Sequence, residues 1–317
     1  MRRLAAFMVL SSSTLPYAGL CLRSLFRNRR DDFRMVLITD DDDDRTQLSA
    51  FLDEAGLSEA GVEIVIRAEA DARAGTAFAG HPNIRRFREG HPCWLKVTDP
   101  WLLATPDEEV IVLDPDLFFP NPFRFEKAPE TGILLMRQGP NCLYPPEAVA
   151  DGFAAGLRFA DHVDIGVAQY RRAALDLDVL EDILGRQPFA PYAGFMHVEA
   201  IVWSALAMRL GGGHLDPRAW FCWERGYVKR VADALGVPGH HLLRLEPIGR
   251  VKCAHLGGRS KWWGQEAFRR GIIGYGDHPI EAETRILRFE EYRPADFQRD
   301  RRTKTLIKRL TLGRVGS

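Results

Sequence analysis

The sequence has few of the features that assign a protein to a class at once. Its five cysteines are widely spaced and form no Cys-x-x-Cys pair, which argues against a zinc knuckle or a disulfide framework and favours a reducing compartment. No apolar run reaches the roughly 18–20 residues that a membrane-spanning helix needs. Basic and acidic residues number 43 each, so no excess charge attracts nucleic acid to the whole surface. We therefore expect a soluble, cytoplasmic protein whose membrane contacts are at most peripheral.

The composition is that of a folded chain. Of the 317 residues, 46% are hydrophobic and 27% are charged, which excludes disordered and fibrous classes. The length suits one large domain or two small ones. No internal repeat or low-complexity linker divides the chain, so we expect one α/β domain over residues 1–296, followed by a basic tail over residues 297–317.

Short apolar segments alternate with helical patterns in the first half of the chain. This alternation is typical of βαβ units and predicts a mostly parallel, Rossmann-like sheet with helices on both faces. The pattern is less regular later, so we expect an elaborated C-terminal half. The predicted strands are Leu4–Leu10, Met35–Thr39, Val62–Ile66, Val110–Leu113, Ile133–Met136, Val163–Tyr170 and Val251–Leu256, and the predicted helices are Tyr17–Arg27, Gln47–Ala55 and Val198–Leu210.

The first apolar segment also imitates part of an export signal, because Arg2 and Arg3 precede it. It is only seven residues long, and no clear small-x-small cleavage site follows it. We interpret Leu4–Leu10 as a buried strand. Asp40–Asp44, after the second predicted strand, is interpreted as a solvated loop that caps the next helix rather than as a cation site.

The most informative motif follows the fourth predicted strand. Val110–Leu113 runs into Asp114-Pro115-Asp116, and Pro115 indicates that the strand has ended there. Two carboxylates at this spacing can converge on one divalent cation, and ligands of open α/β sheets collect at the carboxyl ends of strands. A solvated turn is the alternative, since Asp and Pro are common turn residues.

A second motif stands near the end of the last predicted strand. It consists of His255, two glycines ending at Gly258, and Lys261 followed by Trp262 and Trp263. A neutral imidazole can complete a metal site that carboxylates begin, while glycine and lysine suit phosphate oxygens. A glycine turn leading into an amphipathic helix would give the same pattern without any ligand.

Together the two motifs resemble those of the family 8 retaining glycosyltransferases, the glycogenin-like and lipopolysaccharide galactosyltransferase-like group with a GT-A fold. That family has an apolar strand ending in Asp-x-Asp and a late His-x-x-Gly-x-x-Lys-Pro-Trp. Here Trp262 replaces the proline. The likeness extends over roughly residues 4–270, and it implies a GT-A nucleotide-diphospho-sugar transferase fold.

The resemblance also implies a ligand set. A manganese or magnesium ion would be held by Asp114, Asp116 and His255. The diphosphate of a nucleotide sugar would contact Gly258 and Lys261, with Asp114 also beside the donor. These positions match the family's motifs residue by residue.

Three more positions follow from the same resemblance. Lys96 matches a basic position that contacts the donor, although a lysine on a surface helix would fit the pattern equally well. Ser11 and Tyr17 lie where the family receives the nucleotide base and ribose, and Ser11 would also serve as a helix cap.

Two positions depart from the family. Its Asn-x-Gly appears here as Asp164-Ile-Gly166, and its Asp-Gln pair best matches Val198-Glu199. Acidic groups beside the sugar can stabilise positive charge at the anomeric carbon or act as a nucleophile. We therefore expect Asp164 and Glu199 to be the catalytic residues.

The function implied is metal-dependent, retaining transfer of a hexose from a UDP-sugar to a glycan or glycolipid. One alternative is a haloacid-dehalogenase-type phosphatase, with Asp114 as nucleophile, Asp116 as acid/base and Mg²⁺ as cofactor. Leu117-Phe118 after the motif and the long segment before it argue against this alternative. The other is a protein that binds sugar nucleotides without turnover.

The basic tail has a composition of its own. It holds seven basic residues and one acidic residue, so the rest of the chain carries an acidic excess of six. Leu306, Ile307 and Leu310 would share one face of a helix. A cationic amphipathic helix predicts contact with an anionic membrane surface, and a solvated terminal helix is the alternative.

Overall fold

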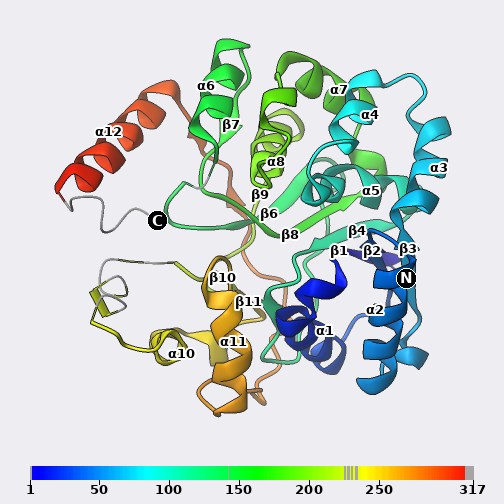
Figure 1. Cartoon of the computed structure of the whole chain (residues 1–317), viewed down its shortest axis with the longest axis vertical. Coiled ribbons are helices and arrows are strands. Elements are labelled where there is room, and N and C mark those ends of the chain that lie inside the picture. The colour runs from blue at the N-terminus through cyan, green and yellow to red at the C-terminus, as the bar shows by residue number, and fades with distance from the viewer. Residues whose placement is uncertain are drawn as a thin grey trace.

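The computed structural model describes residues 2–141, 143–224, 226, 229, 231–232 and 235–310, with the backbone alone given for residues 306–310. Its centre is an eight-stranded sheet with the order β12-β9-β6-β8-β4-β1-β2-β3 (Figure 1). Strands β3, β2, β1 and β4 are mutually parallel, which confirms the mostly parallel sheet expected from the first half. The strand bounds are Leu4–Val9 for β1, Phe33–Thr39 for β2, Val62–Ile66 for β3, Glu109–Leu113 for β4, Ile133–Arg137 for β6, Val163–Arg171 for β8, Gly212–His214 for β9 and Leu287–Arg288 for β12.

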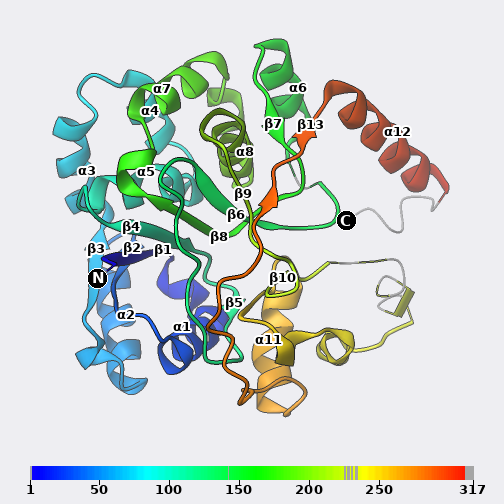
Figure 2. The same ribbon diagram turned by 180° about the vertical axis from the view of Figure 1, so that it is seen from behind.

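Helices cover both faces of this sheet, as Figures 1 and 2 show. Side chains of a strand point alternately to opposite faces. In β1, Ala5 and Phe7 join the core beneath α3, α4, α5, α7 and α8, whereas Ala6 and Met8 join the core beneath α1 and α2. The helix bounds are Leu15–Asn28 for α1, Asp42–Glu54 for α2, Arg67–Ala77 for α3, Pro82–Arg88 for α4, Leu95–Leu103 for α5, Pro146–Ala154 for α6, Leu177–Arg186 for α7 and Val198–Leu210 for α8.

The second half departs from the parallel pattern. Strand β8 runs antiparallel to both β4 and β6, so it brings its first residues to the edge where β4 ends. Figure 2 shows the chain between α11 (Ser260–Arg269) and α12 (Pro294–Leu310) running along the back of the molecule. There β12 joins the sheet edge at β9, and β13 (Glu291–Tyr292) pairs with β7 (Phe159–Ala160).

A small second sheet brings the two sequence motifs together. It has the order β10-β11-β5, with β10 at Trp220–Cys222, β11 at Cys253–His255 and β5 at Leu117–Phe118. Because β5 directly follows the Asp-x-Asp motif, its pairing with β11 places His255 opposite Leu117. The predicted late strand thus exists as β11, within this sheet. The short helix α10 (Gly239–Leu242) lies beside α11 below it.

The prediction for the aspartate run was right about capping and exposure, since Asp41 caps the next helix and Asp40–Asp43 are exposed, but wrong about where the helix begins. Helix α2 begins at Asp42 rather than near Gln47, because Asp41 caps it by accepting from Asp44 N and because carboxylates favour a helix N-terminus. Asp44 itself is buried and accepts hydrogen bonds from Ser12 N at 2.8 Å and Thr39 Oγ1 at 2.9 Å. The run therefore caps and begins α2 with exposed carboxylates, and only Asp44 is buried, bonded to Ser12 and Thr39.

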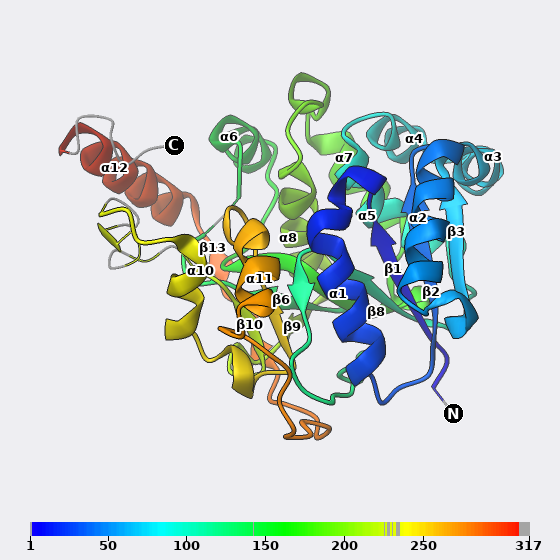
Figure 3. The same cartoon turned by 60° about the horizontal axis from the view of Figure 1, so that its bottom comes forward.

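Helix α12 extends from the body of the protein, as Figure 3 shows. Its start is anchored, because Phe297 is buried against Phe153 and Tyr292. The predicted apolar face of Leu306, Ile307 and Leu310 lies outside the residues whose side chains are described. Within the described ranges we find no helical segment with the length and apolarity that crossing a bilayer demands.

Candidate functional site

A cleft of about 590 Å³ opens where β1 and β4 end and β8 begins. This is the edge at which open α/β sheets collect ligands, because the carboxyl ends of parallel strands meet there. The helices α5, α8 and α11 close its sides. All ten residues predicted from the sequence line it, namely Ser11, Tyr17, Lys96, Asp114, Asp116, Asp164, Glu199, His255, Gly258 and Lys261.

The Asp-x-Asp motif is held at both ends by its backbone. Asp114 N donates to the carbonyl of Gly166 on β8 at 2.9 Å, and the carbonyl of Asp116 accepts from Leu256 N at 3.0 Å. Asp114 thus belongs to the end of the central sheet, while Asp116 already belongs to the small sheet. Pro115 and Asp116 form a turn, but both carboxylates line the cleft and are only 13% and 11% exposed, so the alternative of a solvated turn does not apply.

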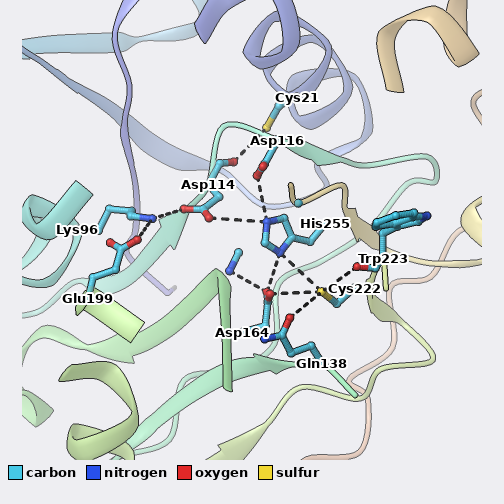
Figure 4. Close-up of polar contacts among 12 residues, drawn as sticks. Cys21, Lys96, Asp114, Asp116, Gln138, Asp164, Glu199, Cys222, Trp223 and His255 are labelled. Carbon is cyan, nitrogen blue, oxygen red and sulfur yellow. Dashed lines mark hydrogen bonds and ion pairs between the residues drawn. The ribbon is translucent and has the colours of Figure 1, made fainter. Parts of the chain in front are cut away.

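His255 lies between the two aspartates and a third acid (Figure 4). Its Nε2 is 3.1 Å from Asp116 Oδ1 and 3.8 Å from Asp114 Oδ2, while its Nδ1 is 2.8 Å from Asp164 Oδ1. Burial opposes protonation, but the charges of Asp164 and Asp116 hold the pKa of His255 well above its usual value. The acidic surroundings thus favour a positive charge at this position, which either the protonated imidazole or a bound cation can supply.

Asp114, Asp116 and His255 fit a divalent cation. Each offers one ligand atom, and these atoms all lie within 4.8 Å of one another. Two carboxylates this close repel each other, so a positive ion between them is favourable. Carboxylate oxygens and one imidazole nitrogen suit Mn²⁺ or Mg²⁺. The site is thus chemically competent for the ions that the sequence predicted.

Asp164 faces the histidine rather than open space. Its Oδ1 accepts from His255 Nδ1 and, at 2.9 Å, from Gly166 N, while its Oδ2 lies 3.3 Å from Cys222 Sγ. A Cβ atom on Gly166 would stand 2.7 Å from the His255 ring, so a larger residue could not sit there without displacing it. The Asp-x-Gly pair therefore holds the imidazole in place.

Lys96 and Glu199 form a buried pair on the other side of Asp114. Lys96 Nζ lies 2.7 Å from Asp114 Oδ1 and 2.6 Å from Glu199 Oε1. The alternative of a surface lysine is wrong, because Lys96 is only 5% exposed. Although burial opposes it, the charges of Asp114 and Glu199 hold the pKa of Lys96 well above its usual value. Burial raises the pKa of Glu199 to about 8.

The outer part of the cleft is formed by α1 and the loop before α11. Lys261 Nζ lies 4.7 Å from the centre of the Tyr17 ring, and the Trp262 ring packs edge-on against the same ring at 5.0 Å. Gly258 has a φ of +64°, a conformation that favours glycine. Burial raises the pKa of Tyr17 to about 12, so its hydroxyl stays protonated. The first turn of α11 thus presents a lysine to the cleft, and the loop before it presents backbone groups.

Several residues that line the cleft were not predicted from the sequence. Cys222 stands opposite His255 in the pairing of β10 with β11, and Gln138 lies next to it. Nothing in the sequence marks Cys222, because the pairing joins segments 33 residues apart. His197, directly before α8, also lines the cleft and could have been found from its place beside Glu199.

The comparisons with known proteins bear on the fold. No protein-family model and no curated protein sequence matches the chain. Mouse xyloside xylosyltransferase 1 matches with a TM-score of 0.51 and 13% identity over 82% of this chain and 99% of that one. The galactosyltransferase LgtC, solved with donor and acceptor sugar analogues, matches with a TM-score of 0.50 and 13% identity over 85% and 95%.

The chain has a GT-A glycosyltransferase fold. This confirms the fold predicted from the two motifs and their resemblance to family 8. The fold gives no support to the haloacid-dehalogenase-type alternative. In this GT-A chain the Asp-x-Asp motif, His255 and Lys261 all line one cleft at the carboxyl edge of the sheet.

Proposed function

We propose that the protein is a metal-dependent, retaining glycosyltransferase that moves a hexose from a UDP-sugar to a glycan or glycolipid. The observation that carries the proposal is the convergence of a cation-type ligand set with two lysines in one cleft of a GT-A fold. A doubly charged diphosphate needs positive charge, which the body of the chain lacks overall. The cleft supplies it locally.

The donor would lie along the cleft from Tyr17 to Glu199. Asp114, Asp116 and His255 would hold Mn²⁺ or Mg²⁺, which supplies positive charge to the departing nucleoside diphosphate. Lys261 and the backbone near Gly258 contribute further donors to the phosphates. Ser11 follows the end of β1 and Tyr17 lies in the first turn of α1, and these two residues would contact the ribose and base.

The two acids that depart from the family would have different roles. Asp164 is engaged by His255, Gly166 and Cys222, so it acts on the reaction through the histidine. Glu199 keeps one buried oxygen, Oε2, without a hydrogen-bond partner among the described residues. An unsatisfied carboxylate oxygen beside the sugar can stabilise positive charge at the anomeric carbon. Glu199 is therefore the stronger candidate for a catalytic residue.

The acceptor would approach over an exposed apolar surface at the cleft. Phe195 and Met196 are 40% and 41% exposed, directly before the cleft residue His197. The Tyr144 ring packs edge-on against the rings of Phe195 and His197 at 5.8 and 6.0 Å. Aromatic faces with this exposure suit the apolar face of a sugar ring.

The test of this function is the substitution Asp116→Asn. It removes one negative ligand, so metal-supported release of UDP from a UDP-sugar should fall by about 100–1,000-fold. The assay uses UDP-glucose and UDP-galactose with Mn²⁺, and a panel of phosphate monoesters is run beside them. Asp178→Asn is the control, because that side chain is 91% exposed on α7. Undiminished turnover in the Asp116→Asn variant, or turnover of phosphate monoesters alone, would overturn the assignment.

We also propose that α12 contacts anionic membranes. Arg299, Arg301, Arg302 and Lys304 are exposed along this helix, and lipid headgroups of opposite charge would attract them. Sedimentation with phosphatidylserine vesicles should capture the protein, and vesicles of phosphatidylcholine alone should not. Replacing Arg301, Arg302 and Lys304 by Glu should abolish capture, and equal capture of this variant would refute the idea.

A further inference from the structure

His255 has a second group of ligand atoms on the side of its ring away from the Asp-x-Asp motif. Asp164, Cys222 and His255 each offer one atom, and these atoms also lie within 4.8 Å of one another. The three residues come from β8, β10 and β11, and all are buried. Figure 4 shows the sulfur and the Asp164 carboxylate converging on Nδ1 of the imidazole. A thiol in such a group changes the kind of metal that it suits.

The distances among these atoms are close to those of a tetrahedral zinc site. Cys222 Sγ lies 3.3 Å from Asp164 Oδ2 and 3.9 Å from His255 Nδ1, and Nδ1 lies 2.8 Å from Asp164 Oδ1. Zn–S, Zn–N and Zn–O bonds of ordinary length place tetrahedral ligands roughly 3.3–3.6 Å apart. Movements of these atoms by about half an ångström would therefore accommodate the ion. Gln138 Oε1, 3.8 Å from Sγ, is a nearby oxygen that could serve as a fourth ligand.

We propose that Asp164, Cys222 and His255 form a second metal site, selective for thiophilic divalent cations such as Zn²⁺. A thiolate ligand favours zinc over manganese and magnesium, which prefer oxygen. All three residues line the cleft, so an ion can reach them from solvent without unfolding. On binding, the thiol proton and the proton of Nδ1 pass to solvent, and the sulfur, the ring nitrogen and a carboxylate oxygen become the ligands.

The two metal sites share one imidazole and therefore exclude each other. When Nδ1–H donates to Asp164, the lone pair of Nε2 is free to bind a cation between Asp114 and Asp116. When zinc occupies Nδ1, the remaining proton stays on Nε2, which lies 3.1 Å from Asp116 Oδ1 and then has no lone pair for a cation. A neutral imidazole has only one proton and one lone pair. Zinc should thus displace the ion that supports transfer, a consequence that rests on the proposed function.

The site itself can be tested without any activity. Co²⁺ is the probe, because cobalt bound to a thiolate gives an intense near-ultraviolet charge-transfer absorption and cobalt bound to oxygen and nitrogen does not. The wild type and Cys93→Ser should show this band, since Cys93 is a second thiol lining the same cleft. Cys222→Ser should lose it. Persistence of the band in Cys222→Ser, or its absence from the wild type, would overturn the site.

Zinc affinity supplies a second measurement. Removing a direct ligand should weaken Zn²⁺ binding, followed by calorimetry, by more than about tenfold in Cys222→Ser. Asp164→Asn should also weaken it, and this variant decides the matter if both Cys222→Ser and Cys222→Ala fail to fold. Zinc affinity unchanged in Asp164→Asn would then refute the site.

The competition is tested in the Mn²⁺-supported transfer assay. Each variant is compared with its own zinc-free rate, and the zinc concentration for half inhibition should rise by more than about tenfold in Cys222→Ser but not in Cys93→Ser. A cobalt–thiolate band without zinc inhibition would refute the competition while leaving the site in place. Absence of transfer activity in every variant would count against the proposed function, whereas the cobalt band would still decide the metal site.

Discussion

Two buried lysine–glutamate pairs of this protein have nearly the same geometry. Lys252 Nζ lies 2.7 Å from Glu126 Oε1, and the two side chains are 0% and 2% exposed. Lys96 Nζ lies 2.6 Å from Glu199 Oε1, and these side chains are 6% and 4% exposed. Yet the surroundings of the two glutamates differ. The two pairs differ in whether the carboxylate oxygens of the glutamate all have hydrogen-bond partners within the protein.

Glu126 has every partner that it needs within the protein. Its Oε1 accepts from Lys252, from Trp220 Nε1 at 2.9 Å and from Thr284 Oγ1 at 2.8 Å, and its Oε2 accepts from Thr284 N at 2.8 Å. Burial opposes ionisation, but the hydrogen bonds from Lys252 and Trp220 hold the pKa of Glu126 below its usual value. The carboxylate is therefore charged and saturated, as buried ion pairs must be to persist.

Glu199 is incomplete by the same standard. Only its Oε1 is bonded, to a lysine that it shares with Asp114, and its Oε2 has no partner among the described residues. Burial raises its pKa to about 8, opposite in direction to the shift at Glu126. An unsatisfied buried carboxylate costs stability, so we propose that Glu199 serves function rather than folding.

The largest effect is expected from Glu126→Gln. The substitution leaves Lys252 buried without a counter-charge and turns an amide N–H₂ toward groups that themselves donate. The free energy of unfolding should fall by about 3–5 kcal/mol. Urea denaturation followed by tryptophan fluorescence measures the change.

Glu130→Gln is the matched control, because Glu130 lies in the same segment but is exposed. Its stability should stay within about 0.5 kcal/mol of the wild type. If Glu126→Gln were as stable as this control, the two lysine–glutamate pairs would not differ in the way described.

The same substitution at the other pair should have the opposite profile. In Glu199→Gln the amide oxygen still accepts from Lys96, and Lys96 keeps Asp114 as its counter-charge. Near pH 4.5, where Glu199 is protonated and glutamine resembles it, the free energy of unfolding should change by less than about 1 kcal/mol. Above about pH 8, where Glu199 is ionised, kcat for sugar transfer should fall by about 100-fold, because the charge beside the anomeric carbon is lost. A large loss of stability with full activity would reverse the comparison.

The difference between the pairs should also depend on pH. In the metal-free protein the folded-state pKa of Glu199 is raised from 4.5 to about 8, so its contribution to stability is complete below about pH 4.5 and is lost as the pH rises toward 8. Glutamine does not titrate. Denaturation curves between these limits should therefore show Glu199→Gln gaining stability relative to the wild type as the pH rises. A constant difference would mean that Glu199 is ionised throughout.

Much of the fold could be predicted from the sequence, because apolar segments such as Val110–Leu113 and Met35–Thr39 are buried strands throughout. The sequence also predicted that the Asp-x-Asp motif and His255 lie close together, because both stand at the ends of predicted strands and both resemble motifs of family 8 glycosyltransferases. The helix start at Asp42 was missed, because a run of like charges favours solvent and a helix N-terminus equally. What decided it was a tertiary contact, the hydrogen bonds of Asp44 to Ser12 and Thr39.

The finer chemistry of the site could not be predicted, because it depends on contacts between distant segments. Asp164 meets His255 across 91 residues, and Glu199 meets Lys96 across more than a hundred. Cys222 reaches the imidazole only because β10 and β11 pair in register. No local pattern encodes such contacts, so the sequence could name Asp164 and Glu199 as acids near the sugar but not say which partner each has.

The smallest effect on activity is expected from removing an exposed aromatic ring beside the cleft. Beside Glu126, the rings of Trp220 and Phe125 stack on each other at 6.0 Å and are buried. Beside the Glu199 cleft, by contrast, the Phe195 side chain is 40% exposed, although the Phe195 carbonyl accepts a hydrogen bond from Trp94 Nε1 at 3.0 Å.

We expect Phe195→Ala to raise KM for the acceptor about 3–10-fold, because one stacked ring contributes on the order of 1 kcal/mol. The values of kcat, KM for the donor and the free energy of unfolding should stay unchanged. Leu245→Ala, which removes a 70% exposed side chain outside the cleft, should change none of these values. If Phe195→Ala instead lowered stability and left the acceptor KM unchanged, the ring would stabilise the fold rather than bind the acceptor.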